Sequence, residues 1–212
     1  MRTDPAEDSM SLSTLIRDDA RRSTRSGPSP SANDDRGSKP RAAPAIRGLR
    51  ALLDELDALA RRGPLEMSDL RSVFDRLQLR GSDLTAFQLF DSECYRRNRI
   101  RRTEAYEMLL ICWAPGQESP VHDHRGSICA FQVLEGTCCE QRFERLPDGP
   151  EGGLRAAASP EWLEYERGTV CVSRDADIHR VANRCGERNL CTLHVYSPPL
   201  DGMRSYQPIA QA

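Results

Sequence analysis

The chain lacks both a long hydrophobic run and an excess of charge of one sign. Its 212 residues carry 30 Lys and Arg against 32 Asp and Glu, which leaves a net charge of −2. This balance gives no electrostatic reason to expect nucleic acid or an anionic membrane as a partner. No apolar run approaches the roughly 20 residues that cross a bilayer, and residues 1–22 contain no apolar core of the signal-peptide type. We therefore expect a cytoplasmic protein that binds neither nucleic acid nor a membrane, and we expect it to be a monomer.

Cysteine pairs with the spacing of a zinc site are also absent. The eight cysteines include no CxxC pair, which argues against a structural zinc site. At 212 residues the chain is long enough to bury a core without disulfide bonds. We interpret most of the cysteines as reduced, buried, small hydrophobic residues.

The first 44 residues have almost nothing to bury. The segment 23–44 is rich in Ser, Pro, Gly and charge. Because such a composition cannot offset the entropy of ordering, residues 1–44 are predicted to form a disordered tail. A solvated tail is favoured over a contact patch formed by its arginines. The remainder, 45–212, has the size of one substantial domain.

A helical layer is predicted at about 45–92. Apolar residues recur at helical spacing from Ile46 to Leu59, before a Gly-Pro pair that ends this helix. A second apolar stripe predicts a helix over about 66–78, and Ser82 is placed to cap a third, short helix. These stripes are interpreted as core contacts.

A β-barrel is predicted over about 103–208. Short stretches rich in β-branched, aromatic and cysteine residues follow one another at 105–114, 128–136, 137–143, 169–173 and 189–197. Gly- and Pro-containing turn signals separate them, which is typical of a small antiparallel sandwich or barrel. The sequence therefore predicts a mainly β fold with an N-terminal helical layer.

All four histidines lie in this β half, at His122, His124, His179 and His194. On an extended strand the side chains of His122 and His124 project from the same face, because they are two residues apart. His179 follows another candidate strand about 50 residues downstream, and in a barrel such a strand can face the first pair. Three imidazoles leave other metal coordination positions open, which favours a catalytic site over a structural one.

The histidine pattern resembles the two motifs of the cupins. HxH is followed by Gly136 and then by HxxxN at 179–183. Typical cupins carry a glutamate ligand five residues after the second histidine, and Cys129 occupies that position. The usual Pro and Gly before the histidine of the second motif are Arg174 and Ala176. These departures point to a subgroup.

That subgroup resembles the cysteine dioxygenase family of thiol dioxygenases. The resemblance covers residues 45–208 and rests on motifs in the right order. They are 95-YRRN-98, LLICWAPGQESPVHDH ending at His124, Cys129, the HRVAN of His179, and 192-TLHVYSPP-199. It implies a cupin-like barrel and a metal-dependent enzyme.

The resemblance implies Fe(II) held by His122, His124 and His179. Three neutral imidazoles leave the site with the full +2 charge of the ion, so a substrate thiolate can bind and be stabilised there. A carboxylate ligand would reduce that attraction. The residues alone leave nickel, zinc and manganese open as alternatives.

The family's YRRN motif places a substrate carboxylate on Arg97, and Tyr95 lines the same pocket. A guanidinium matches a carboxylate because its planar fork makes two parallel hydrogen bonds. By itself this arginine-rich run would be a solvated basic face. The motif selects Arg97 from among its neighbours.

The segment 192–196 alternates, so Thr192, His194 and Tyr196 share one strand face. By residue type alone this is an ordinary half-polar strand. The resemblance implies a hydrogen-bonded triad beside the iron, in which His194 orients Tyr196 and is not a fourth ligand.

The resemblance also gives Cys129 a second interpretation besides a buried residue that fills space. In family members with cysteine at this position, the thiol can join the active-site tyrosine through a thioether bond. Cys129 and Tyr196 match those two positions. A crosslinked chain would be lighter by two hydrogens, and the bond would lock the phenol in place.

The expected reaction is the oxidation of L-cysteine by O₂ to cysteine sulfinic acid, with both oxygen atoms transferred to sulfur. Two alternatives stay open. One is a dioxygenase for 3-mercaptopropionate or another small thiol acid, against which Arg97 argues because the mercaptopropionate enzymes typically lack arginine there. The other is a non-catalytic cupin that binds a small ligand or a metal, with the tail recruiting a partner.

Overall fold

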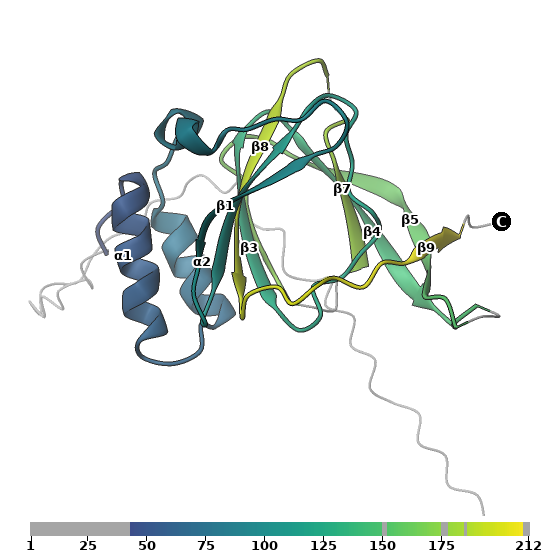
Figure 1. The fold of residues 1–212 in the computed structure, drawn as a ribbon, viewed down its shortest axis with the longest axis horizontal. Helices are drawn as coiled ribbons and strands as arrows, with labels where there is room; N and C mark the ends of the chain where they lie inside the picture. Colours follow the sequence, from purple (N-terminus) through teal and green to yellow (C-terminus); the bar gives the residue numbers. More distant parts are fainter. Residues whose placement is uncertain (1–42, 150–151, 175–177, 185, 210–212) are drawn as a thin grey trace, which may run out of the picture. The chain divides into compact units, whose positions relative to one another are not determined.

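The described chain begins with helices and continues with strands (Figure 1). The computed structural model describes residues 43–149, 152–174, 178–184 and 186–209. The expected disordered tail, residues 1–44, lies almost entirely outside these ranges. None of the described helices has both the length and the apolar character that crossing a bilayer needs.

Two α-helices form where the apolar stripes predicted them. They are α1 (Gly48–Ala60) and α2 (Met67–Arg76), followed by a 3₁₀ helix, η1 (Gly81–Phe87). The expectation that Ser82 caps the third helix is wrong, because Ser82 lies inside η1. The carboxylate of Asp83 instead accepts a hydrogen bond of 2.8 Å from the backbone N–H of Arg80, just before the helix.

The rest of the described chain is mainly β-strand. The strands are β1 (Arg96–Arg102), β2 (Glu107–Trp113), β3 (Ile128–Glu135), β4 (Cys138–Leu146), β5 (Arg155–Tyr165), β6 (Val170–Ser173), β7 (Ile178–Ala182), β8 (Leu190–Ser197) and β9 (Gln207–Ile209). Among the described residues they form a five-stranded sheet in the order β1-β2-β8-β3-β6 and a four-stranded sheet in the order β7-β4-β5-β9. The predicted fold, a small cupin-like β-barrel with an N-terminal helical layer, is confirmed (Figure 1).

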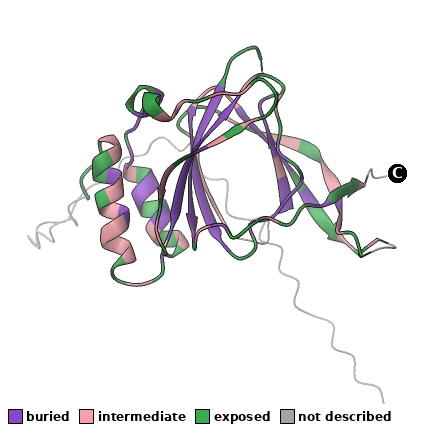
Figure 2. Ribbon diagram, viewed as in Figure 1, coloured by how far each residue is buried: buried purple, intermediate pink, exposed green. Residues whose placement is uncertain are grey.

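The five-stranded sheet has one face for the helices and one for the barrel interior. Met108 and Leu110 of β2 pack with the helices, and so do Leu193 and Val195 of β8. The alternate residues of β2, such as Ile111, belong to a second buried cluster inside the barrel. Figure 2 shows these strands buried between the helices and the second sheet. Alternate residues of these strands therefore point to the helical layer and to the barrel interior.

Several strands were not predicted from the sequence. β1 begins at Arg96, before the expected start of the barrel at residue 103, and it is mostly arginine because it is an edge strand with much of its surface exposed. β5 contains Pro160, which reads as a strand breaker. In the structure this proline lies at the register shift between β4 and β5, where a missing backbone donor is tolerated.

Most of the described cysteines are buried, as expected. Cys112 and Cys191 face each other across β2 and β8 with their sulfur atoms 3.9 Å apart. Cys185 lies outside the described residues.

Candidate metal centre

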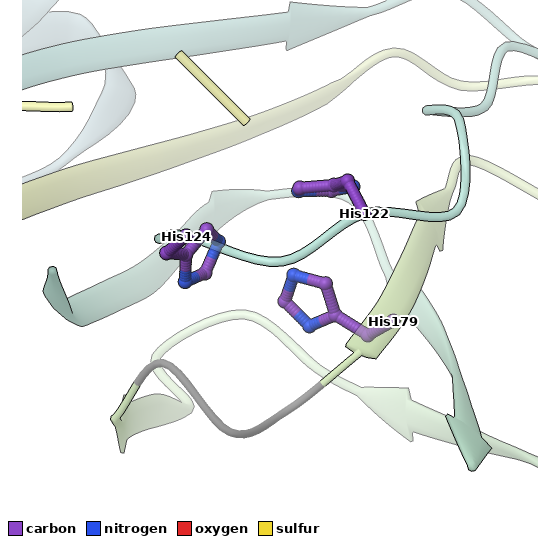
Figure 3. A group of neighbouring side chains, drawn as sticks. All are labelled: His122, His124 and His179. Atoms are coloured by element: carbon purple, nitrogen blue, oxygen red, sulfur yellow. The ribbon is translucent and has the colours of Figure 1, made fainter. Parts of the chain in front are cut away.

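Three histidines from two parts of the chain meet inside the barrel. His122 and His124 lie in the connection 114–127 between β2 and β3, and His179 lies in β7. The backbone N–H of His122 donates to the carbonyl oxygen of His179, and the N–H of His179 returns the bond, both at 2.9 Å. One ring nitrogen from each histidine lies within 4.8 Å of the other two. Figure 3 shows the three rings around one space, and together they can hold a metal ion.

The HxH pair does not lie on a regular strand, contrary to the expectation that one strand would carry both histidines. β2 ends at Trp113, and a turn follows in which Gly116 has a φ of 82°, a left-handed value that favours glycine. His122 is extended only locally, through isolated bridges to His179 and Ser205. Backbone pairing with the second sheet therefore orients this segment.

Hydrogen bonds determine which ring nitrogen of His122 and of His179 is available to a metal ion. The Nδ1 atom of His122 lies 2.8 Å from the carbonyl oxygen of Pro120, and that of His179 lies 2.6 Å from a carboxylate oxygen of Glu140. Both partners are acceptors, so each Nδ1 carries a proton. The lone pair of Nε2 is then free for a metal in both histidines.

The electrostatics of the site favour neutral rings. Burial, together with the nearby His179 ring, lowers the pKa of His122 to about 4 and that of His124 to about 2. Neutral imidazoles with convergent lone pairs are suitable ligands for a divalent first-row metal ion. The residues present therefore fit a metal whose own charge is not cancelled by its ligands.

Glu140 is a site residue that sequence reasoning missed. It is buried in β4, where its carboxylate accepts from His179 and, at 2.7 Å, from the hydroxyl of Tyr165. Burial alone would raise the pKa of Glu140, but the hydrogen bonds from these two partners hold it below its usual range. The signal in the sequence was a carboxylate two residues after Cys138, on the same inward face of a predicted strand.

Asp123, between the two histidines of HxH, was also overlooked. It is buried, and its carboxylate accepts from the hydroxyl of Tyr206 and, at 2.7 Å, from Arg204 Nε. Its partners lie in the segment that leads into β9. Asp123 therefore ties the histidine-bearing connection to the C-terminal part of the domain.

The three histidines line one pocket inside the barrel. Arg97 and Tyr95, both selected from the sequence, line it together with Met203. The ring of Tyr95 stacks on Trp113, with ring centroids 4.4 Å apart. Arg97 Nη1 donates to the sulfur of Met203 at 3.5 Å.

Arg97 differs in its partners from three other arginines of β1. Arg99 and Arg102 pair with the buried carboxylate of Glu107, and Arg101 pairs with Asp57. Among the ion pairs between described residues, none includes Arg97 or its neighbour Arg96. Of these two, Arg97 lines the pocket, so its guanidinium is available to an anion that enters there.

Thr192, His194 and Tyr196 all lie on the interior face of β8. The Tyr196 hydroxyl is 3.1 Å from His194 Nδ1, and His194 Nε2 is 2.9 Å from the hydroxyl of Thr192. His194 stands apart from the three-histidine group. Burial lowers the pKa of His194 well below its usual value, so this ring is neutral as well.

Cys129 of β3 lies directly opposite Tyr196 in the pairing of β3 with β8. Its sulfur is 3.8 Å from His194 Nδ1, and it is not part of the three-histidine group. Burial raises the pKa of the thiol, which keeps it protonated. Cys129 therefore faces the tyrosine and not the metal ligands.

Two residues of the cupin-like motifs serve the fold. Gly136 has a φ of 77°, and a Cβ on it would lie 2.7 Å from the backbone oxygen of Asn189, so any larger residue is strained and too close. The buried amide of Asn183 donates to the backbone oxygens of Trp113 and Arg188, at 3.1 and 2.9 Å. Asn183 thereby fixes the end of β2 beside the pocket.

Known proteins resemble the chain over most of its length. The family model for cysteine dioxygenase type I matches residues 41–208. A cysteine dioxygenase type 1 from Danio rerio is 26% identical over 161 residues, which cover 74% of this chain and 78% of that protein. The Bos taurus protein of the same name is 24% identical, with 76% and 79% covered. A solved Klebsiella pneumoniae protein with a double-stranded β-helix domain has a TM-score of 0.47 at 14% identity, over 58% of this chain and 88% of its own. The match of the family model over residues 41–208 establishes that the chain belongs to the cysteine dioxygenase type I family.

Proposed function

We propose that the protein is an Fe(II)-dependent dioxygenase that oxidises L-cysteine to cysteine sulfinic acid. The observation that carries this proposal is one pocket with three convergent histidines and an arginine that has no carboxylate partner among the described residues. The thiol and O₂ combine to give the sulfinic acid, both oxygen atoms end on sulfur, and no external reductant is needed.

His122, His124 and His179 would hold the iron, which supplies the redox chemistry that lets O₂ react with a thiolate. Because imidazole ligands bring no negative charge to the ion, its charge would remain available to bind the thiol as its anion. The buried walls of the pocket keep water away from that pair and strengthen the attraction.

Arg97 would bind the substrate carboxylate with two parallel hydrogen bonds, as a guanidinium does best. Tyr95, stacked on Trp113, would form the neighbouring wall. Tyr196 would hold its hydroxyl at the edge of the pocket, oriented by His194 and Thr192. The arginine favours L-cysteine over 3-mercaptopropionate.

The reaction itself provides the first test. The full-length protein loaded with Fe(II) should consume O₂ when L-cysteine is added, and labelled O₂ should give a sulfinate that carries two labelled oxygen atoms. His179→Ala should lose both the bound iron and the activity, because it removes one of three ligands. A lack of O₂ uptake by the iron-loaded wild type would reject the proposal.

Arg97→Gln should raise the KM for L-cysteine about 10- to 100-fold, since a charge-assisted hydrogen bond contributes about 1.5–3 kcal/mol. Arg99→Gln is the matched control, because the guanidinium of Arg99 is already paired with Glu107 on the same strand. The kcat/KM values for L-cysteine and 3-mercaptopropionate would be compared in all three proteins. An unchanged KM in Arg97→Gln would remove this residue from the substrate site.

Glu140→Gln should weaken metal binding by about tenfold, near the lower end for partners of metal-ligating histidines, because the amide oxygen can still accept from His179. Tyr165→Phe is the control, since it removes only the hydroxyl that bonds to the same carboxylate. It should have a smaller effect. Calorimetric titration with Fe(II) under anaerobic conditions measures this without turnover. Equal affinities in wild type and Glu140→Gln would show that the carboxylate does not support the ligand.

Cys129 and Tyr196 are also proposed to form a thioether bond during turnover. The sulfur would bond to a ring carbon, while the S–H and C–H bonds break and O₂ takes up both hydrogens as hydrogen peroxide. The intact mass of protein incubated with iron, L-cysteine and O₂ should then fall by two hydrogens. Cys129→Ser should show no loss. If a digest after prolonged turnover contains Cys129 and Tyr196 only in separate, uncrosslinked peptides, the proposed bond is contradicted.

A further inference from the structure

The triad on β8 continues to a residue that its sequence pattern does not include. The indole Nε1 of Trp113 donates to the hydroxyl oxygen of Thr192 at 3.1 Å. Trp113 ends β2, next to β8 in the sheet, and it is almost completely buried. Four side chains therefore form one hydrogen-bonded line from Trp113 through Thr192 and His194 to Tyr196.

An indole N–H can only donate, so it sets the direction of the line. Thr192 accepts from Trp113, and its own proton then needs an acceptor. Within the described residues the only other hydrogen-bond partner of this hydroxyl is His194 Nε2, and Thr192 has no exposed surface. If Nε2 carried a proton, the threonine proton would be buried without a partner, which costs about 1–3 kcal/mol. Thr192 therefore donates to Nε2.

This direction decides the tautomer of His194. The ring is neutral because it is buried, so a lone pair at Nε2 places its single proton on Nδ1. Nδ1 then donates to the hydroxyl oxygen of Tyr196, 3.1 Å away. The proton of Tyr196 must point away from His194, toward the Cys129 thiol and the pocket.

We propose that Trp113 is a positioning residue: through Thr192 it holds His194 in the Nδ1–H tautomer and makes Tyr196 a hydrogen-bond donor to the pocket. His194 in this state cannot take the proton of Tyr196. A donor at that position stabilises negative charge that develops on a substrate or on oxygen, and this consequence rests on the proposed dioxygenase activity.

Two contacts hold the indole in place for this role. Tyr95, which lines the pocket, stacks on the ring of Trp113, and the buried Asn183 donates to its backbone oxygen at 3.1 Å. Trp113 is thus contacted both by Tyr95 of the pocket wall and by Asn183, which follows β7.

The test is the protonation of His194, read by ¹⁵N NMR of the histidine side chains. The full-length chain would be measured with Zn(II) as a diamagnetic probe and again without added metal, and the signals of His194 identified by their loss in His194→Gln. The wild type should carry the proton on Nδ1. In Trp113→Phe, which keeps an aromatic ring against Tyr95 but removes the donor, Thr192 is free to accept, and the Nε2–H tautomer should become populated.

Trp162→Phe is the matched control, because Trp162 is the other tryptophan of the chain. Its ring lies against Arg180 and Arg184 and is not part of the hydrogen-bonded line. Trp162→Phe should leave the tautomer of His194 unchanged. An Nε2–H tautomer in the wild type overturns the proposal without any variant, and so does an unchanged tautomer in a folded Trp113→Phe.

Kinetics separate positioning from loss of the fold. In the iron-loaded enzyme, Trp113→Phe should lower kcat about tenfold, in line with the cost of about 1–3 kcal/mol for a misdirected buried hydroxyl, while the KM for L-cysteine changes little. A rise in KM with kcat unchanged would contradict this role. If the wild type does not oxidise L-cysteine, the proposed function fails, but the tautomer still decides the role of Trp113.

Discussion

The site depends on two backbone hydrogen bonds between His122 and His179. They join a connection that belongs to no regular strand to β7 in the four-stranded sheet. Because that connection leaves β2 and returns to β3, both in the five-stranded sheet, the pairing links the two sheets where the ring nitrogens meet. The carboxylate of Asp123 reinforces it by holding Arg204 and Tyr206 from the C-terminal segment. This backbone pairing thus brings the rings of His122 and His179 together.

Two groups of buried polar side chains beside the pocket are joined by hydrogen bonds. Glu140 is matched by His179 and Tyr165, and on β8 His194 is bonded to Thr192 and Tyr196. Satisfied buried networks are rigid, because every alternative arrangement leaves a group without a partner. Arg97, bonded only to a methionine sulfur among the described residues, departs from this rule. A cation left in this state beside the three-histidine group can accept an anion.

Most of the fold and the identities of the gathered side chains could be predicted from the sequence. The five predicted strand segments were found, while β1, β5, β7 and β9 were not predicted. In β1 and β5, an exposed arginine-rich edge and a proline at a register shift hide the strand pattern. The two-residue spacing of His122 and His124, with His179 downstream, predicted the three-histidine group. The roles of Glu140 and Trp113 were missed because they depend on which strands become neighbours. The local pattern could place Glu140 on the inward face of its strand, but it could not show that His179 would be its partner.

Cys129 shows why a single substitution can change what a site binds. A glutamate at this position would bring a negative charge into a buried pocket where Arg97 is the cation without a carboxylate partner among the described residues. It would pair with that arginine or with the metal, and in either case it would compete with an anionic substrate. A buried thiol stays neutral because burial raises its pKa, and it contacts the relay at His194. Under the proposed function, cysteine at this position would leave Arg97 and the metal ion available to a substrate that carries a thiolate and a carboxylate.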